Sequence, residues 1–414
     1  MEKHMPIPPP DVIDIPPLRI LMIAPNPFFV DRGFSVQVYE QARELIRLGH
    51  QVTICTYHCG RDLPGLDIRR TPNIPWYTAD QIGASYHRLY INLLLFALSL
   101  RVCREIKPDV IHGHIHEGAL IGEMVRWVTG VPVLFDLQGG LVEELRDKGF
   151  LKGDGLLVKT FRWLERRIDH GADLIVTQSA AMAEDLRVNF GVPPERVHLT
   201  MDGVNTEDFR PGLATPELRR ELGLPSDKKI VVYLGLLTEY QGVDCLLQAI
   251  PLVIRQYPAV HFLIMGYPVE KYQRMAAAMG ISDHITFTGR IDYARAAEYI
   301  CLGDVAASPK LGKTEANGKL YNYMACGLPT VAFDAWVNRE ILGEYGVYAS
   351  PIGDPAALAN AIVQVLSDDE LARRLGQGGR ERVVKMYSWA NVARRLVQFY
   401  GMAQANHKNR AHAR

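Results

Sequence analysis

The stretch KIVVYLGLLTEYQGVDCLLQAIPLVIRQYPAVHFLIMGY, residues 229–267, contains the pattern that decides the fold. Its two apolar runs, 229–237 and 260–267, are continuous rather than alternating, as expected for strands that helices cover on both faces. Between them, residues 243–258 repeat apolar side chains at roughly four-residue spacing, which is typical of an amphipathic helix. The stretch therefore predicts a strand–helix–strand unit of a parallel sheet.

Runs of the same kind recur along the whole chain between helical stretches. The first half contains LRILMIAP, QVTICTY, DVIHGH, VPVLFDLQ, ADLIVTQS and VHLTMDG, and the second half adds HITFTGR, DVAASP, LPTVAFD and GVYAS. A dozen strands would make one very wide sheet, so two sheets in two domains are expected. The predicted fold class is α/β, with two doubly wound Rossmann-like domains that face each other across a cleft.

The composition places the boundaries between these domains. Residues 1–17 are rich in proline and are expected to form a flexible lead-in. The first domain is predicted over residues 18–204 and the second over residues 229–386. The polar segment 205–228, which prolines interrupt, is the expected linker, and residues 387–414 form a terminal helix and tail.

Composition also limits the classes of function. Of 414 residues, 48% are hydrophobic and 22% are charged, as in ordinary globular proteins, so wholesale disorder is not expected. Lysine plus arginine equal aspartate plus glutamate at 46 each, so the chain lacks the bulk positive charge of a protein that grips nucleic acid. We therefore expect no nucleic-acid partner.

Cysteines and apolar segments indicate the compartment. The six cysteines include no Cys-x-x-Cys pair and are typical of reduced, mostly buried thiols. The start lacks the apolar core of a signal peptide, and the most apolar stretch, residues 89–102, is shorter than the roughly 18 to 20 residues of a membrane span. We expect a soluble, cytoplasmic protein.

Polar residues follow the strands of the first domain, at the edge where doubly wound domains bind ligands. Gly33 precedes a helix, where its backbone can approach an anion, although a plain strand-to-helix turn is the alternative. In HGHIHEG, His112, His114 and His116 would share one face if the third strand continued. Polar cleft residues, a metal trio and plain structural histidines are the three interpretations. Gln138 ends the fourth strand, again where a substrate would lie.

The densest signal is SPKLGKTEANGKLYNYMACGLPTVAFDAWVNRE, residues 308–340. Asn317 and Gly318 turn the chain into a helix that begins near Lys319. The free amides at this helix start, together with Lys319 and Lys310, predict a binding site for a diphosphate.

Further residues complete this predicted site. A carboxylate and an amide match the hydroxyls of a sugar or ribose, and Glu315 and Asn322 supply these groups. Gly235, Gly289 and Arg290 follow strands of the second domain and are assigned to the same site.

The order of these motifs resembles the retaining family 4 glycosyltransferases, which have the two-domain GT-B fold. The resemblance covers nearly the whole chain from Leu18 onward. It rests on GHQVTICT (49–56), KPDVIHGH (107–114), DGVNTEDFRP (202–211), MACGLPTVAFD (324–334) with NREIL (338–342), and residues 388–400. It implies an N-terminal acceptor domain, a C-terminal nucleotide-sugar domain, and a last helix that crosses back to the first domain.

The chain departs from the family pattern at several positions. The usual pair of acidic residues eight apart is not intact, because its second position is Asn322. Leu236 and Gln241 replace the basic pair that usually holds the diphosphate, and Gln138 replaces a histidine. The two lysines of the predicted diphosphate site would take over phosphate binding, as in family variants with a K-L-Y-x-Y-M-A pattern.

The resemblance implies a retaining, metal-independent hexosyltransferase, which moves a sugar from a nucleotide diphosphate sugar to a hydroxyl of a polysaccharide, glycolipid or small glycoside. The nucleotide sugar is a co-substrate, and neither a cofactor nor a metal is expected. His112, His114 and Gln138 would orient the acceptor or the transferred sugar, and Glu315 and Lys319 complete the catalytic set. One alternative is an inactive GT-B protein that only binds a nucleotide or a partner, and the missing basic pair and missing histidine support it. The other alternative is a metal-dependent hydrolase built on HGHIHEG.

A basic and apolar surface in the first domain suggests a lipid-linked acceptor. The apolar residues 89–102 are flanked by His87, Arg88, Arg101, Arg104 and Lys107, and Lys159, Arg162 and Arg166 share a face of a predicted helix. Such a surface suits anionic headgroups, and a core helix with a solvated basic edge is the alternative. We therefore add a peripheral contact with the inner face of the membrane as an expectation.

Overall fold

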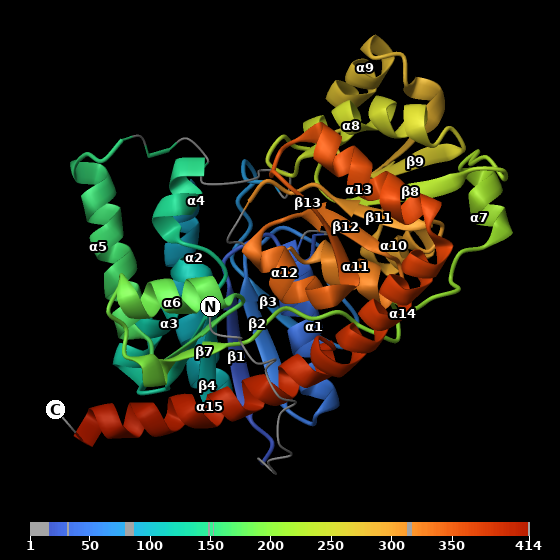
Figure 1. Cartoon of the computed structure of the whole chain (residues 1–414). Coiled ribbons are helices and arrows are strands. Elements are labelled where there is room, and N and C mark those ends of the chain that lie inside the picture. The colour runs from blue at the N-terminus through green and yellow to red at the C-terminus, as the bar shows by residue number, and fades with distance from the viewer. Residues whose placement is uncertain are drawn as a thin grey trace. The chain divides into compact units, whose positions relative to one another are not determined.

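The computed structural model describes residues 16–30, 33–78, 87–147, 150–151, 153–312 and 317–412. Two compact units emerge from the contacts within the chain. The N-terminal unit holds the described residues up to Asp202 and again from Trp389 onward, and the C-terminal unit holds Gly203–Ser388. Figure 1 shows a sheet with helices around it in each unit.

The N-terminal unit is built on a seven-stranded sheet in the order β3-β2-β1-β4-β5-β6-β7, and every neighbouring pair is parallel. Its strands are β1 (Arg19–Ala24), β2 (Gln51–Thr56), β3 (Asp67–Arg70), β4 (Val110–His114), β5 (Val133–Leu137), β6 (Leu174–Thr177) and β7 (Val197–Leu199). Its helices are α1 (Gly33–Arg47), α2 (His87–Ile106), α3 (Ile115–Thr129), α4 (Leu141–Asp147), α5 (Leu156–Gly171), α6 (Ala180–Val188) and α15 (Trp389–His412).

The C-terminal unit is built on a six-stranded parallel sheet in the order β10-β9-β8-β11-β12-β13. Its strands are β8 (Lys229–Leu234), β9 (Val260–Met265), β10 (Ile285–Gly289), β11 (Val305–Ser308), β12 (Thr330–Phe333) and β13 (Gly346–Ala349). Its helices are α7 (Pro216–Glu221), α8 (Val243–Gln256), α9 (Glu270–Ala278), α10 (Ala296–Ile300), α11 (Lys319–Ala325), α12 (Trp336–Leu342), α13 (Pro355–Ser367) and α14 (Asp369–Met386).

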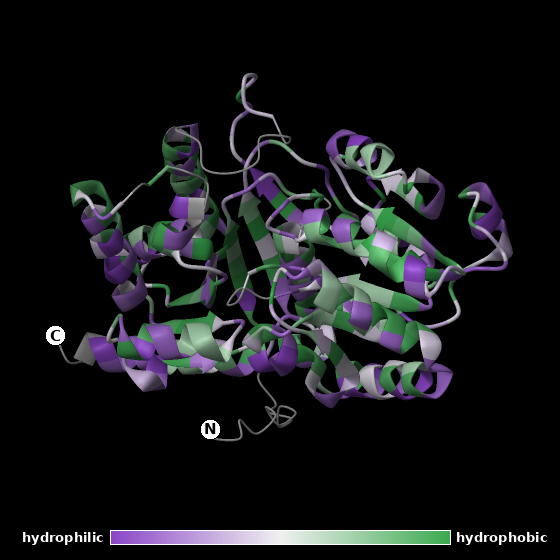
Figure 2. Cartoon of the chain, turned by 45° about the horizontal axis from the view of Figure 1, so that its top comes forward, coloured by the Kyte–Doolittle hydropathy of each residue, from purple (hydrophilic) through white to green (hydrophobic). Residues whose placement is uncertain are grey.

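The apolar runs of the sequence form the cores of these sheets. In α8, Leu246 and Ile250 are fully buried and pack with strand residues such as Phe262 in one cluster. Burial of one such side chain stabilises the fold by about 1.5 to 3 kcal/mol. Figure 2 shows the result as hydrophobic strands inside each unit and helices of mixed hydropathy outside. The predicted class, two parallel α/β Rossmann-like domains, is confirmed.

Two local predictions differ from the structure. β3 was not predicted, because its sequence DIRR is polar and it lies at the sheet edge, where its side chains are at least partly exposed. β4 ends at His114, so His116 lies in α3, and the expected face of three histidines on one strand is wrong. The first turn of α3 packs tightly against the end of β4 there. Only glycine fits at position 113, because a Cβ would lie 2.7 Å from the Gly118 carbonyl oxygen.

The chain passes between the units after Asp202 and again after Ser388. Close to these points, the Val204 N–H donates to the Tyr387 carbonyl oxygen at 2.8 Å, and Val204 forms a β-bridge with Ser388. The segment predicted as a linker packs onto the C-terminal unit. There, the Arg380 guanidinium donates to the carbonyl oxygens of Thr206 at 2.9 Å and Phe209 at 2.7 Å.

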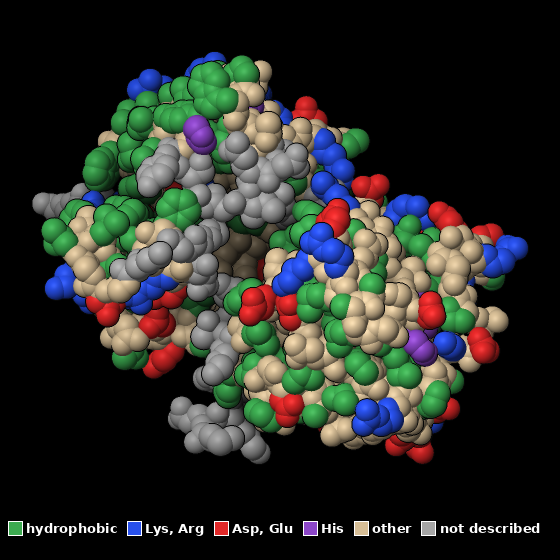
Figure 3. Space-filling view, turned by 90° about the horizontal axis from the view of Figure 1, so that it is seen from above, with side chains coloured by type: hydrophobic (Ala, Val, Ile, Leu, Met, Phe, Trp, Pro, Cys, Tyr) green, Lys and Arg blue, Asp and Glu red, His purple; other side chains and the backbone are tan. Residues whose placement is uncertain are grey.

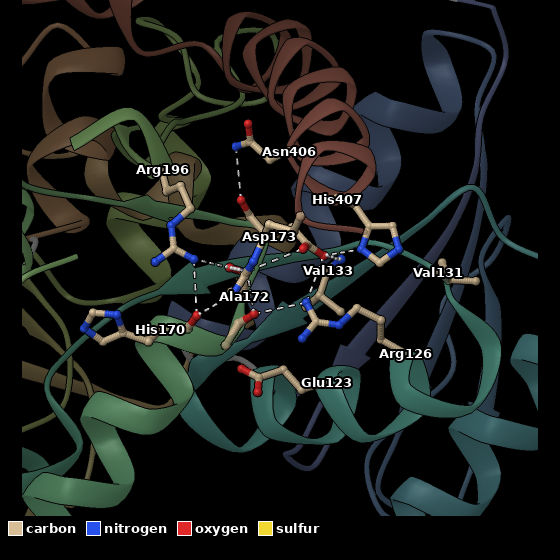
Figure 4. Close-up of polar contacts among 12 residues, drawn as sticks. Glu123, Arg126, Val131, Val133, His170, Ala172, Asp173, Arg196, Asn406 and His407 are labelled. Atoms are coloured by element: carbon tan, nitrogen blue, oxygen red, sulfur yellow. Dashed lines mark hydrogen bonds and ion pairs between the residues drawn. The ribbon is translucent and has the colours of Figure 1, made fainter. Parts of the chain in front are cut away.

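A buried carboxylate anchors α15 to the N-terminal unit (Figure 4). Asp173, which is 1% exposed, accepts from Arg126 at 3.0 Å and lies 3.3 Å from His407 and 3.5 Å from Arg410 of α15. Arg410 also donates to the carbonyl oxygens of Gly171 and its two chain neighbours. This last helix therefore belongs to the N-terminal unit by specific ionic contacts.

Among the described residues, no helix combines the length and the apolar character that a membrane crossing requires.

Candidate functional site

Lys319, the first residue of α11, reaches back to the end of β8. Its Nζ donates to Gln241 Oε1 at 2.8 Å and lies 4.5 Å from the centroid of the Tyr233 ring. Gly235 has φ of +149°, and a Cβ there would come within 3.0 Å of the Lys319 amine, so glycine leaves room for this side chain. Burial, and then the charge of Lys310, lowers the pKa of Lys319 to about 7.

Lys310 follows β11 and brings a second amine to the same unit. Its side chain is 5% exposed, and Nζ lies 5.5 Å from the ring centroid of Tyr240, in the loop after β8. The two loops interlock, because Leu311 N–H donates to the Tyr240 carbonyl at 3.1 Å and a Cβ at Gly242 would lie 1.8 Å from the Pro309 carbonyl oxygen. Both predicted lysines thus contact the loop after β8, Lys310 at Tyr240 and Lys319 at Gln241.

Asn317 and Gly318 form the turn before α11. The side-chain amide nitrogen of Asn317 donates to Ser308 Oγ and to Asn338 Oδ1, both at 2.9 Å, so it holds the turn against the end of β11 and the first turn of α12. Gly318 is exposed, with open space where a Cβ would stand. Asn322 is half-buried, and the predicted partner Glu315 lies outside the described residues.

Gly289 and Arg290 lie at the end of β10. Gly289 has φ of +71°, and its carbonyl accepts from Gly266 N–H at 2.9 Å, which ties it to the end of β9. The Arg290 guanidinium carbon lies 5.6 Å from the Tyr267 ring centroid. Gly235 therefore sits at the carboxyl end of β8, and Gly289 and Arg290 sit at the carboxyl end of β10, with β9 between the two strands.

In the N-terminal unit, His112 and His114 share one carboxylate. Asp136 Oδ2 lies 3.6 Å from His112 Nε2 and 3.4 Å from His114 Nδ1, and all three side chains are fully buried. Gln37 and Gln41 of α1 donate to the same oxygen at 3.0 and 3.2 Å. A buried carboxylate needs hydrogen-bond donors, and the two glutamine amides supply them to Oδ2.

Protonation follows from these contacts. Burial opposes the charge of Asp136, but the adjacent imidazoles of His112 and His114 outweigh it and hold the pKa of that carboxyl well below its usual range. Burial, and then the charge of His114, lowers the pKa of His112 to about 4, so this imidazole is neutral at pH 7. His112 Nδ1 lies 2.9 Å from the Tyr400 hydroxyl of α15, which fixes the orientation of the ring.

These groups lie close enough to be considered as metal ligands, since their ligand atoms lie within 4.8 Å of one another. The two imidazole rings are stacked, however, with centroids 4.1 Å apart and planes tilted by only 25°. The lone pair of a ring nitrogen lies in the ring plane, so nearly parallel planes do not direct both nitrogens at one ion. The geometry favours a shared-carboxylate pair over metal coordination.

His116 belongs to a second cluster. Its Nε2 lies 3.4 Å from Asp169 and 3.9 Å from Glu165, both on α5. Burial works against the imidazolium, but the Asp169 hydrogen bond and the nearby carboxylates outweigh it and raise the pKa of His116. Glu165 accepts from Leu141 N–H at 2.6 Å, and burial raises the pKa of Glu165 to about 7.

Gln138 and Gly33 stand at the ends of β5 and β1. Gln138 is half-buried, and its amide nitrogen finds no hydrogen-bond acceptor among the described residues. It lies three residues before the Leu141 amide that Glu165 binds, so the His116 cluster holds this loop. Gly33 is the first residue of α1, with open space around its Cα.

Sequence reasoning missed several residues that build these clusters, among them Asp136, Tyr233 and Tyr400. Asp136 carries a signal, because it is an acidic residue inside the apolar strand VLFDL. Tyr233 and Tyr400 carry none, since an aromatic residue in a strand or helix is usually core. Their roles come from partners 86 and 288 residues away.

Comparison with known proteins places this architecture. The chain matches the solved structure of sucrose-phosphate synthase from Thermosynechococcus elongatus with a TM-score of 0.75 and 21% identity. The match covers 93% of this chain and 98% of that structure. HepE from Anabaena, solved with UDP and glucose, matches with a TM-score of 0.72 and 16% identity over 92% and 98% of the two chains. The fold is that of the GT-B glycosyltransferases.

Sequence families and relatives then define the class. Residues 32–203 match the family described as glycosyl transferase 4-like domain, and residues 228–368 match glycosyl transferases group 1. D-inositol 3-phosphate glycosyltransferase of Corynebacterium diphtheriae is 26% identical over 90% of each chain. Phosphatidyl-myo-inositol mannosyltransferase of Mycobacterium leprae is 35% identical over 48% of this chain and 52% of that relative. The chain belongs to the GT-B glycosyltransferases, and it acts on nucleotide sugars.

Proposed function

We propose that the protein is a retaining, metal-independent hexosyltransferase, whose donor is a nucleoside diphosphate hexose and whose acceptor is a hydroxyl group. The observation that carries the proposal is the pair Lys310 and Lys319, which both contact the loop after β8 at the carboxyl end of the C-terminal sheet. No cofactor is required, because the nucleotide sugar itself supplies the leaving group.

The pair answers the main chemical demand of the reaction. When the glycosidic bond breaks, negative charge builds on the leaving diphosphate while the sugar becomes cation-like. Fixed cations that meet this charge stabilise the transition state without reorganisation. The positions of the family's usual basic pair are occupied by Leu236 and Gln241. Lys310 and Lys319 take over the role of that pair, and also the role that a metal ion would have. Gln241 holds the Lys319 amine instead.

A Lys319→Ala variant tests the donor site. We expect loss of transfer by about 10²- to 10³-fold, the range seen when one electrostatic donor is removed. The assay measures transfer and hydrolysis with UDP-, GDP- and ADP-hexoses, and the anomeric configuration of the product, with and without EDTA. Lys408→Ala, on α15, is the matched control. Unchanged transfer by a folded Lys319→Ala protein refutes the phosphate role, and an inverted anomeric product or loss of activity in EDTA refutes the mechanism.

The names of the relatives suggest which acceptors to try. One relative acts on D-inositol 3-phosphate and another on phosphatidyl-myo-inositol. Inositol phosphates and phosphatidylinositol are therefore the first acceptors for the assay. In the acceptor domain, Gln138 has an uncommitted amide donor that suits a hydroxyl, and the buried pair His112 and His114 would support it.

A lipid-linked acceptor agrees with the surface of α5. Leu156 and Trp163 are 82% and 64% exposed, while Lys159, Arg162 and Arg166 are exposed on the same helix. At the start of α2, Leu89 and Leu93 are also exposed, although the rest of its apolar side packs in the core. Figure 3 shows hydrophobic and basic side chains together on this unit. Exposed aromatic and aliphatic side chains beside cations favour an anionic lipid surface.

Co-sedimentation with vesicles tests this contact. We expect binding to phosphatidylglycerol vesicles at low salt, little binding to phosphatidylcholine, and weaker binding by Trp163→Ala. Trp127→Ala is the matched control, because Trp127 is 69% exposed but lies on α3. Equal loss in both variants, or no binding by the native protein, refutes a membrane contact through α5.

A further inference from the structure

Two glutamines stand side by side at the carboxyl edge of the N-terminal sheet. Leu137 of β5 and Thr177 of β6 are register partners, and Gln138 and Gln178 are the residues that follow them. Neighbouring strands lie about 4.8 Å apart, so two side chains that leave them at the same level can reach one small molecule. Sequence reasoning singled out only Gln138 of this pair.

Both side chains carry a buried donor that has no acceptor. Neither Gln138 Nε2 nor Gln178 Nε2 has a hydrogen-bond partner among the described residues. Gln178 is only 6% exposed, so its amide N–H groups are also held away from bulk water. A buried donor without a partner is destabilising, and native proteins normally place ordered water or a ligand at such a group. Two such donors at adjoining strand ends point to a ligand site.

The neighbouring strand end extends the same polar edge. His114 of β4 is the register partner of Asp136 of β5, and residues two apart on a strand share a face, so Gln138 continues the face of that pair. Both ring nitrogens of His114 lack a hydrogen-bond partner among the described residues. The opposite face of these strands is core, since Leu137 packs there in an apolar cluster, and its partner Thr177 belongs to that face.

The chemistry of this edge favours an uncharged ligand that is rich in hydroxyls. The strand-end segments contain neither lysine nor arginine: 110–114, 136–140 and 176–180. A phosphate group would find the carboxylate of Asp136 there, which repels it, whereas amide N–H groups donate to hydroxyl oxygens without any charge. Phe34 of α1 adds an apolar ring, whose centroid lies 6.0 Å from that of His114. A ring with several hydroxyls offers oxygens to the amides and C–H groups to Phe34.

We propose that Gln178 is a second binding residue for the acceptor, and that with Gln138 it holds neighbouring hydroxyls of an uncharged polyol ring, a cyclitol or a hexose. Each amide donates one N–H to one ring oxygen, and the hydroxyl that receives the transferred sugar stays free. A phosphate or lipid carried by the same acceptor lies away from this edge. The assignment to an acceptor rests on the proposed transferase function, but the binding can be measured without a sugar donor.

Saturation-transfer NMR with myo-inositol tests the site. We expect the native protein to bind myo-inositol, and Gln178→Met to bind it about 3- to 10-fold more weakly, the range for one neutral hydrogen bond. Thr177→Val is the matched control, because Thr177 Oγ1 is also buried without a partner among the described residues but belongs to the opposite face. Inorganic phosphate should not displace myo-inositol. No binding by the native protein, unchanged binding by Gln178→Met, equal loss in both variants, or displacement by phosphate overturns the proposal.

Thermal unfolding and kinetics separate binding from folding. We expect Gln178→Met and Gln178→Leu to melt at or above the temperature of the native protein, because both remove a buried donor that has no partner. A lower melting temperature in both variants would mark a structural role and overturn the assignment. In the transfer assay, the KM for the acceptor should rise by the factor seen in NMR, and the KM for the nucleotide sugar should not change. If the native protein transfers sugar from no donor, the proposed function fails, and the NMR titration still decides the Gln178 site.

Discussion

At the scale of single residues, Lys319 would couple the proposed nucleotide binding to the uptake of protons. Its pKa in the folded protein is about 7, below the ordinary 10.5, so the unfolded chain holds more protons between these values. This group therefore makes the unliganded fold more stable as pH rises from about 7 toward 10. A bound diphosphate favours the charged amine, so it should bind more weakly over the same range.

Calorimetry can measure this proton directly. At about pH 8, we expect UDP binding to take up protons, seen as a binding enthalpy that changes with the ionisation enthalpy of the buffer. Lys319→Arg should bind without uptake, because arginine is always charged. Equal uptake by the native protein and Lys319→Arg would show that another group is responsible.

The residues of the site divide into those a sequence can indicate and those it cannot. Lys310 and Lys319 stand in a dense polar segment after a strand, so their place in the fold was predictable. The partner that holds Lys319 was not, because Gln241 lies 78 residues away and its side chain was interpreted only as a lost cation. The pairing of His112 and His114 through Asp136 is equally a product of tertiary contact.

At the scale of elements, the Asp173 contacts should decide how firmly α15 is held. We expect Asp173→Asn to cost about 3 kcal/mol of unfolding free energy, because it leaves buried cations without their counter-charge. Hydrogen exchange should also rise in residues 401–412. Asp109→Asn is the matched control, since the side chains of Arg19 and Asp109 are 44% and 32% exposed and such a pair is worth about 1 kcal/mol or less. Equal losses in the two variants would contradict the anchoring role.

Strands and helices with a buried face were predictable because their apolar pattern is continuous. The features that the sequence did not predict, β3 and the end of β4, depend on contacts with neighbouring elements instead. β3 is polar and exists through its backbone pairing with β2, and Asp67 at its start accepts from Thr53 at 3.0 Å. The end of β4 at His114 depends on the close approach of Gly113 and Gly118, which no local pattern encodes.

At the scale of the whole molecule, the two lysines of the proposed donor site and the histidine pair belong to different units. UDP alone should therefore protect one unit from hydrogen exchange. We expect slower exchange in residues 235–243 and 305–325, and no change in residues 110–114 or 133–138. Lys319→Ala should abolish the protection. Protection of the histidine segment by UDP alone would place the nucleotide elsewhere.

The bridge between Val204 and Ser388 also bears on how such a chain can be rebuilt. The C-terminal unit is one continuous segment of the chain, and its first and last residues lie side by side at this bridge. A segment whose ends meet can be exchanged as a cassette without stretching its host. If the C-terminal unit holds the nucleotide sugar, as proposed, swapping this single uninterrupted insert should carry donor preference from one glycosyltransferase to another, while the N-terminal unit, α15 included, keeps its own framework.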